Sequence, residues 1–313
     1  MTLRITSPWK RIIEYPDNHL NDFCLFRALD GRWHCIGIMG TGTWESETSL
    51  FHCSSPFLYG PYDIHNPLLA DLGNGATANH APQKHAPFVV IRDDTYHLFF
   101  RRPLGTNLLL MSSDLFTWPR EPEVMFEEND ARDACIQEFG GNYYWYYCQW
   151  RLIEDTGRSC IRLRRSKDLR TWGEPIDVHV DTSREVRHSH LQSPFVVQAG
   201  GRYWLFVRDR SQDADCATTV FASDTPNSFP SGNKAWTCRL TGVHAPEIVK
   251  EQDHCYLARV SGVGLPLSPP RGGWIDLAEI SFRDENRDSQ QPNPGDSQPA
   301  RTRVSSVLFG PLI

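Results

Sequence analysis

One structural unit recurs five times along the chain, and this repeat constrains the fold more than any other feature. Each unit holds a short apolar strand, a turn rich in Asp or Gly, and a second strand rich in aromatic residues. Two clear copies are HAPFVVIRDDTYHLFFRRP (85–103) and QSPFVVQAGGRYWLFVRD (192–209). A strand, a tight turn and a second strand form the pattern of a β-hairpin. The five units start at residues 22, 85, 133, 192 and 244.

A second element follows the hairpin in most units and supplies further strands. It reads LLLMSSDLFTWPREPEVM (108–125) and IRLRRSKDLRTWGEPIDV (161–178), with a weaker copy at 49–64. Together, the hairpin and this element make a four-stranded antiparallel sheet. Repeats of this kind are typical of propeller blades, and these units are slightly longer than compact blades, so we expect long loops.

Aromatic residues make up 12% of the chain, beside 22 Gly and 22 Pro. Large flat side chains suit the faces between radially packed sheets. Trp118, Trp172 and Trp236, which lie in the second element of their units, are predicted to pack there. We therefore predict an all-β fold, a five-bladed β-propeller with four-stranded antiparallel blades around a central channel. A β-sandwich with coincidental internal similarity is the alternative.

We expect one propeller domain over residues 1–313. The segment RDENRDSQQPNPGDSQPART (283–302) is polar and rich in Pro, Ser and Gln, which predicts a mobile surface loop. VSSVLFGPLI (304–313) returns to strand character. It is predicted to close the ring or to complete the last blade.

Charge and hydropathy argue against two classes of partner. The net charge is −6, from 32 basic and 38 acidic residues, whereas binding to a phosphate backbone favours a basic surface. No apolar run approaches the length of about 18 residues that a membrane helix needs. The N-terminal segment MTLRITSPWKRIIEYPDNHL lacks the apolar core of a secretory signal. We predict a cytoplasmic protein with neither a nucleic-acid nor a membrane partner.

The nine cysteines are spread singly and form no CxxC pair. This spacing favours buried thiols over a disulfide framework or a zinc site. His244 is a conceivable ligand of a central metal, but no ligand cluster accompanies it. We predict neither a metal nor a cofactor.

Polar residues recur where the innermost strand of each unit begins. In a propeller these strands line the central channel, so their first residues converge at one mouth. A turn or capping role is the alternative for any single Asp at a strand start. Two Asp and two His in corresponding places of a repeat favour a functional site instead. The set is Asp22, His85, Asp133, Gln192 and His244.

Around these residues the chain resembles the five-bladed propeller glycoside hydrolases of families 43, 32 and 68, which include arabinanases, xylosidases, invertases and levansucrases. LNDFCLF, with Asp22, resembles the N-D-P-N-G or D-P segment that carries the base or nucleophile. ARDACI, with Asp133, resembles the R-D-P segment whose Asp holds the sugar and tunes the acid. The resemblance covers nearly the whole chain at the level of blades. It implies a small glycoside or an oligosaccharide as substrate.

The fourth unit departs from this resemblance at a chemically decisive position. HLQSPFVV resembles the E-S-P-F or E-G-P segment, but Gln192 stands where the family has its general acid Glu. Hydrolysis of a glycosidic bond normally uses two carboxylates, one of which protonates the leaving oxygen. A carboxamide donates a hydrogen bond without transferring its proton. His190, His188 or Glu247 are candidates to supply the proton, unless the substrate has a leaving group that needs none.

HAPE, in the last unit, resembles the segment whose His lies near a central metal or water in some family 43 members, which makes His244 a binding candidate. Arg132 is placed to pair with Asp133 or with a substrate carboxylate. Trp44 and Trp150 follow second strands and are candidates to stack on a sugar ring. Basic residues near blade-strand ends are candidates for the same binding work, with structural ion pairs as the alternative: Lys84, Arg101, Arg102 and Arg208.

Three functional hypotheses remain. The first is a glycosidase-like enzyme with Asp22 as base or nucleophile, Asp133 as stabiliser and a non-standard proton donor such as His190. The second is a propeller that catalyses a cyclisation, elimination or isomerisation. The third is a binding protein without turnover. In each, His85, Arg132, His188, His244 and Glu247 are predicted to contact the ligand.

Overall fold

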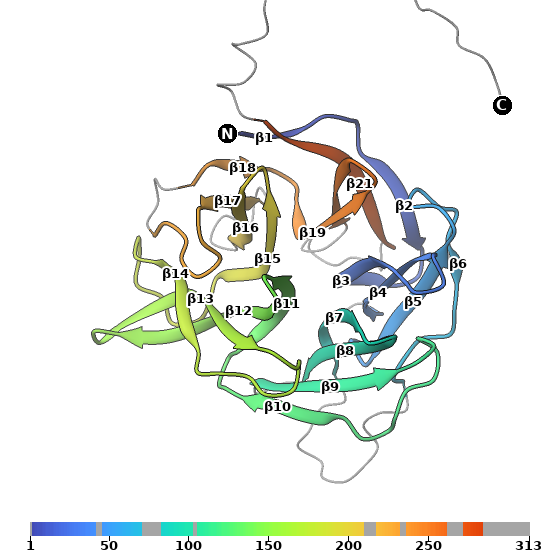
Figure 1. Ribbon diagram of the computed structural model, residues 1–313, viewed down its shortest axis with the longest axis horizontal. Coiled ribbons are helices and arrows are strands. Elements are labelled where there is room, and N and C mark those ends of the chain that lie inside the picture. Colours follow the sequence, from blue (N-terminus) through green and yellow to red (C-terminus); the bar gives the residue numbers. More distant parts are fainter. Residues whose placement is uncertain are drawn as a thin grey trace, which may run out of the picture.

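The computed structural model describes residues 2–41, 46–70, 83–102, 105–209, 217–231, 236–261 and 272–283. Five antiparallel sheets are arranged around a common axis like the blades of a propeller (Figure 1). The described residues contain essentially no helix. The predicted all-β, five-bladed propeller is confirmed.

The first three blades are each built from four consecutive strands, numbered from the axis outward. Blade one holds β3 (His19–Arg27), β4 (Trp33–Gly40), β5 (Ser49–Ser55) and β6 (Asp63–Ile64). Blade two holds β7 (His85–Arg92), β8 (Thr95–Arg102), β9 (Thr106–Ser112) and β10 (Glu123–Glu127). Blade three holds β11 (Arg132–Phe139), β12 (Asn142–Ile153), β13 (Thr156–Ser166) and β14 (Ile176–Asp181).

The last blade joins the two ends of the described chain and so closes the ring. Blade four holds β15 (Leu191–Ala199), β16 (Arg202–Asp209), β17 (Thr218–Ser223) and β18 (Cys238–Leu240). Blade five holds β19 (His244–Glu251), β20 (His254–Ser261) and β21 (Gly273–Arg283). Its outer edge is formed by β1 (Thr2–Ile5) and β2 (Lys10–Tyr15), which both pair with β21 (Figure 1). The predicted closing strand 304–313 lies outside the described residues, as does the polar segment 283–302 beyond Arg283.

Local residue types explain the turns that connect the strands. Gly140 and Gly141, between β11 and β12, both have positive φ, and so do Asp93 and Asp94 between β7 and β8. Two successive residues with positive φ form the hairpin turn that matches the twist of the strands, and Gly and Asp tolerate it best. The hairpins predicted from the Asp/Gly turns therefore form as local structures.

The repeated S-x-D-L segment is a second local device, and it ends the third strand of blades two and three. In blade three, Asp168 Oδ1 accepts hydrogen bonds from the backbone N–H groups of Arg170 and Thr171. Ser166 Oγ accepts from the backbone N–H of Leu169, which has a φ of 66°. Asp114 and Ser112 form the same turn in blade two. These side chains satisfy backbone donors that the strand no longer pairs.

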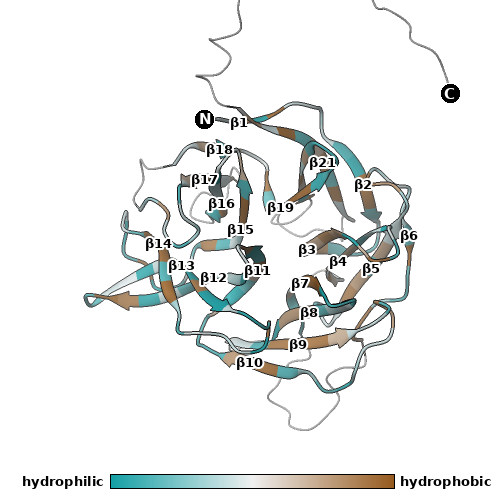
Figure 2. Cartoon of the chain, viewed as in Figure 1, coloured by the Kyte–Doolittle hydropathy of each residue, from teal (hydrophilic) through white to brown (hydrophobic). Residues whose placement is uncertain are grey.

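Apolar side chains concentrate on the strands, and the connecting loops are more hydrophilic (Figure 2). Between blades two and three, Trp145 is fully buried, and its ring centroid lies 5.0 Å from that of Phe99, 4.9 Å from Phe126 and 5.0 Å from Trp172. Trp118 and Trp172 pack against the core, as predicted. The prediction for Trp236 is wrong, because this side chain is 48% exposed.

Replacing Trp145 by alanine is expected to destabilise the fold by about 3–5 kcal/mol, as truncation of a buried aromatic side chain leaves a cavity. The measurement is the free energy of unfolding in guanidinium chloride. Trp236→Ala is the matched control, and its effect should stay within about 0.5 kcal/mol because the side chain is exposed. Equal losses for the two variants would contradict the assigned packing.

The innermost strand of every blade contains a bulge close to its start. In blade four, Gln192 pairs with Arg208 and Phe195 with Phe206, so residues 193–194 are left out of the ladder. The same shift occurs in the other four innermost strands. A bulge re-aims the side chains of the extra residues. Here it turns them towards the axis, where the candidate site lies.

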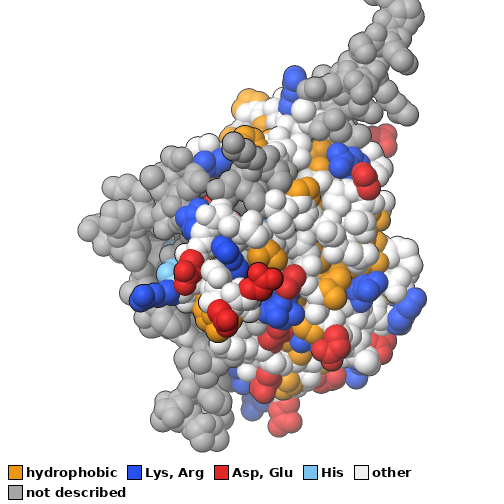
Figure 3. All heavy atoms as spheres, turned by 90° about the vertical axis from the view of Figure 1, so that its left-hand side faces the viewer, with side chains coloured by type: hydrophobic (Ala, Val, Ile, Leu, Met, Phe, Trp, Pro, Cys, Tyr) orange, Lys and Arg blue, Asp and Glu red, His pale blue; other side chains and the backbone are white. Residues whose placement is uncertain are grey.

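The face formed by blades three and four carries interspersed acidic and basic side chains, with isolated apolar ones (Figure 3).

The eight described cysteines are free thiols, and six of them are buried. No helix among the described residues has the length and apolar character needed to cross a lipid bilayer.

Candidate functional site

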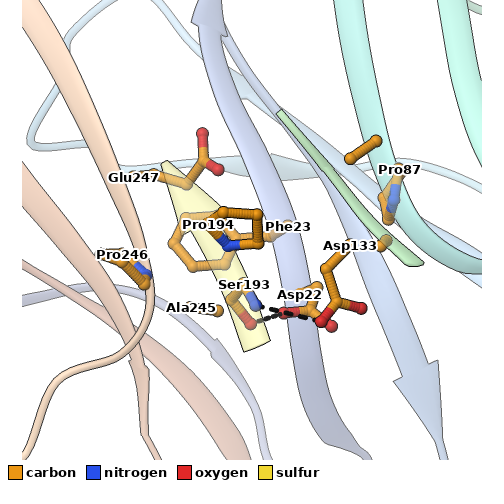
Figure 4. A pocket seen from close by; sticks show the side chains of 11 residues that line it. Asp22, Phe23, Pro87, Asp133, Ser193, Pro194, Ala245, Pro246 and Glu247 are labelled. Carbon is orange, nitrogen blue, oxygen red and sulfur yellow. Dashed lines mark hydrogen bonds between the residues drawn. The ribbon is translucent and has the colours of Figure 1, made fainter. Parts of the chain in front are cut away.

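A small cavity lies at the axis, and the bulges of all five blades line it (Figure 4). Its volume of about 20 Å³ matches the space taken by one water molecule. Three carboxyl groups and one hydroxyl stand among apolar neighbours there. The lining residues are Asp22, Phe23, Ala86, Pro87, Asp133, Ala134, Ser193, Pro194, Ala245, Pro246 and Glu247.

Asp22 and Asp133 are joined through Ser193 (Figure 4). The Ser193 hydroxyl donates a hydrogen bond to Asp22 Oδ1 over 2.6 Å, and the Ser193 backbone N–H donates to Asp133 Oδ2 over 3.0 Å. Cys148 Sγ also donates to Asp133 Oδ2, at 3.2 Å. Strands of blades one, three and four therefore hold both carboxylates in one network.

The Asp22 carboxyl group has a raised proton affinity. Desolvation of the Asp22 carboxylate, with a further contribution from the negative charge of Asp133, raises the pKa of Asp22 to about 7. The hydrogen bond from Ser193 and the charge of Arg208 oppose this shift without cancelling it. A carboxyl group with a pKa near 7 exchanges its proton at neutral pH, which suits acid–base catalysis.

Glu247 contributes a third carboxyl group, which lies apart from the first two. Figure 4 shows it on the opposite side of Phe23 and Pro194 from Asp22. Glu247 is 8% exposed, and burial, reinforced by the negative charge of Asp22, raises its pKa well above the usual range. This environment therefore favours the protonated form of the carboxyl group.

Gln192 is held by an arginine on the neighbouring strand. Arg208 Nη1 donates a hydrogen bond to Gln192 Oε1 over 3.1 Å. The carboxamide oxygen is thereby engaged, and the Gln192 NH₂ group remains a hydrogen-bond donor. No proton transfer follows from this arrangement, because an amide does not titrate near neutrality.

His85 and His244 are anchored by groups from blade one. His85 Nε2 lies 3.2 Å from Glu47 Oε2, and His19 Nε2 lies 3.0 Å from Glu47 Oε1. Burial raises the pKa of Glu47, but the hydrogen bonds from both histidines outweigh it, so the pKa lies below the ordinary value. His244 Nε2 contacts Asn21 Oδ1 at 2.9 Å.

Arg132 is tied to the segment that precedes blade four. Its Nη2 donates to the backbone carbonyl of Ser189 over 2.8 Å, and its Nε lies 3.5 Å from Asp130 Oδ1. Trp150 lies in the same region, where its backbone N–H donates to Asp130 Oδ2 and its indole N–H donates to the carbonyl of Val186. Both side chains thus have structural partners.

The structure does not place His190 among the residues that line the central cavity. His190 Nε2 lies 2.7 Å from Asp181 Oδ2 and 3.9 Å from Asp209 Oδ1, in a buried polar cluster between blades three and four. His188 is exposed on the loop before it. Trp44 lies outside the described residues.

The register corrects the predicted equivalence of the five opening residues. His85, Arg132, Gln192 and His244 occupy the same ladder position, immediately before the bulge. Asp133 is instead the first bulged residue, and Asp22 is the second bulged residue of its strand. In blades two, four and five the first bulged residue is alanine or serine: Ala86, Ser193 and Ala245. The second bulged residue is proline in all three: Pro87, Pro194 and Pro246.

Two residues of the site escaped the sequence analysis. Ser193 follows Gln192 directly, and aligning the bulges rather than the strand starts would have placed it opposite Asp133. Glu47 lies outside the repeat, in TWESE (43–47), and carries no sequence signal for its contact with His85. Among the described residues, no group of three or more His, Cys, Asp or Glu side chains is arranged to hold a metal ion.

The comparisons with known proteins identify the fold. No family model matches the chain, and no curated protein matches its sequence. Solved structures do match. A thermostable family-43 glycoside hydrolase aligns with a TM-score of 0.61 at 16% identity, over 85% of this chain and 91% of the other. RS223-beta-xylosidase aligns with a TM-score of 0.64 at 14% identity, over 88% and 96%.

A GH32 beta-fructofuranosidase from Bombyx mori, in complex with sucrose, aligns with a TM-score of 0.63 at 14% identity, over 88% of this chain and 63% of that one. These likenesses agree with the resemblance that the motifs around Asp22 and Asp133 indicated. The chain therefore has the five-bladed propeller fold of the family-43 and family-32 glycoside hydrolases.

Proposed function

We propose that this protein is a glycosidase-like enzyme that cleaves a small glycoside at the mouth of the central channel. The observation that carries the proposal is the pair of carboxylates, Asp22 and Asp133, joined by Ser193 where the five innermost strands converge. Paired carboxylates are the groups that glycoside cleavage requires. The fold shared with glycoside hydrolases supports the same assignment.

In this proposal, Asp22 acts in its ionised form as general base or nucleophile. The Ser193 hydroxyl donates to Oδ1 and so fixes the orientation of the carboxylate. Asp133, beside it, stabilises the positive charge that develops on the sugar ring in the transition state. Its two donors, the Ser193 N–H and the Cys148 thiol, hold one of its oxygens in place.

Gln192 restricts the substrates that this arrangement can process. The leaving oxygen receives a hydrogen bond from the carboxamide and no proton. Among the cavity-lining residues, burial favours the protonated form of Glu247, but Phe23 and Pro194 are drawn between it and Asp22 in Figure 4. We therefore propose that the natural substrate has a leaving group stable as an anion. The direct test is release of phenolate from aryl furanosides and aryl pyranosides, compared with the corresponding alkyl glycosides.

The pH profile should report the ionisation of Asp22. Because the pKa of Asp22 is raised to about 7, kcat/KM should rise about tenfold per pH unit below that value and level off above it. Stopped assays with an aryl glycoside between pH 5 and 9 measure this. Activity that falls above neutrality would contradict the role as base and assign Asp22 as proton donor.

A second function is favoured by the same raised pKa. A carboxyl group that exchanges its proton near neutral pH, with no acid at position 192, is also suited to cyclisation, elimination or isomerisation. In such reactions, Asp22 removes a proton from one atom of the substrate and returns it to another. Solvent deuterium incorporated into a sugar that is recovered unhydrolysed would support this function over hydrolysis.

A further inference from the structure

Arg101 lies at the mouth of the central channel and has no role in the proposed cleavage. It lies near the end of β8, paired across the ladder with His85. Among the described residues, its buried Nε has no hydrogen-bond partner and its guanidinium forms no ion pair. Burial lowers the pKa of Arg101, and the negative charge of Asp133 opposes this effect. A guanidinium remains charged in proteins, so this side chain carries a positive charge that no ion pair with a described residue neutralises.

The register shows where Arg101 stands relative to the site. In the second strand of each blade, one residue pairs with the position that precedes the bulge. In blade three this residue is Cys148, which contacts Asp133 directly. Arg101 and Arg208 hold the same place in the two blades that flank blade three. The remaining blades have the uncharged Met39 and Val260 there.

Two cationic side chains thus stand at the level of Asp133, one on each side of its blade. Arg208 donates to the neutral carboxamide of Gln192. A partly buried guanidinium gains most from an oxyanion that accepts two of its N–H groups in the same plane. Arg101, which forms no ion pair with a described residue, therefore favours a ligand that brings its own negative charge.

We propose that Arg101 binds an oxyanion group of the substrate, so that the site takes acidic glycosides, those bearing a carboxylate, sulfate or phosphate, in preference to neutral ones. The sugar part of the ligand rests on the proposed function. The oxyanion part rests on Arg101 alone. Arg208, on the opposite side of blade three, adds a favourable electrostatic field.

Isothermal titration calorimetry with the full chain tests this. The probes are methyl β-D-glucuronoside, methyl β-D-galacturonoside, the neutral methyl glucoside and galactoside, and sodium sulfate and phosphate. The better of the two uronosides should bind at least about tenfold more tightly than its neutral counterpart, the effect of one charge-assisted pair. Arg101→Gln should abolish this preference, and Arg101→Lys should retain part of it.

The matched control is Arg92→Gln, at the far end of β7, where the arginine pairs with the exposed Asp93. It should leave every affinity unchanged. Thermal unfolding separates binding from folding, because removal of an uncompensated charge should keep or raise the Tm of Arg101→Gln. Equal affinities for acidic and neutral glycosides, or a preference that survives in Arg101→Gln, would overturn the proposal.

Failure of the anion site and failure of the proposed function give different results. Turnover of neutral aryl glycosides without any Arg101-dependent preference would contradict the anion site and leave the glycosidase assignment intact. Binding of sulfate, phosphate or uronosides that depends on Arg101, without cleavage of any glycoside, would support the anion site and contradict hydrolysis. A sulfate or phosphate affinity that exceeds that of both uronosides would assign the oxyanion as a sulfate or phosphate ester.

Discussion

Asp22→Asn should lower kcat for an activated aryl glycoside by about 10²–10⁴-fold, the range associated with loss of a positioned proton-transfer group. The asparagine side chain has the same shape and can still accept a hydrogen bond from the Ser193 hydroxyl, but it neither takes up a proton nor attacks the sugar. Because the ionised carboxylate is the reactive form, the variant should also lose the rise of activity with pH through neutrality.

Steady-state kinetics with an aryl furanoside and an aryl pyranoside measure this effect. Asp63→Asn is the matched control, because the Asp63 side chain is 71% exposed on blade one and pairs only with Arg32 among its described ion pairs. It should retain wild-type activity. Circular dichroism should show the same fold for both variants. Wild-type turnover by Asp22→Asn would refute the proposed chemistry.

Gln192→Glu should raise kcat for an alkyl glycoside by about 10²-fold, because it supplies the second carboxyl group that leaving-group protonation requires. Aryl glycosides, whose leaving groups need little protonation, should change far less. Arg208, which now donates to Gln192 Oε1, will favour the ionised form of the new carboxyl group, whereas the nearby charge of Asp133 opposes it. The gain should therefore be largest at acidic pH.

The comparison is the ratio of alkyl to aryl turnover in the wild-type protein, Gln192→Glu and Gln192→Leu. The leucine variant removes the contact with Arg208 without adding an acid, and should show no gain on alkyl substrates. An equal gain in both variants would mean that release of Arg208, rather than proton donation, is responsible. Absence of any gain in Gln192→Glu would contradict the assignment of position 192 as the missing acid.

Much of the fold was predictable because its signals are local. The Asp/Gly turns and the S-x-D-L segments form hydrogen bonds within a few residues, so each hairpin is specified by its own stretch of sequence. Five copies then specify five blades. The outer edge of blade five was not predicted. β1 and β2 are short, lie outside the repeat, and pair with β21 at the other end of the described chain.

In the candidate site, too, some features were predictable from the sequence and others were not. The repeat brought Asp22 and Asp133 to one mouth, but their partner Ser193 depends on bulge register, which strand starts alone do not reveal. His190 shows the opposite error. It lies two residues from Gln192 in sequence, yet it contacts Asp181 and Asp209 instead of lining the central cavity.

The sequence by itself determined the number of blades, their hairpins and the absence of a carboxylate at position 192, because each follows from residue type or from contacts between near neighbours. Only the tertiary structure decided which side chains share the channel mouth. The closed ring sets residues of different blades against one another, as with Ser193 and Asp22, or Glu47 and His85. The raised pKa of Asp22 and the lack of an ion pair between Arg101 and any described residue arise from that packing, since desolvation and charge proximity depend on distances in space rather than along the chain.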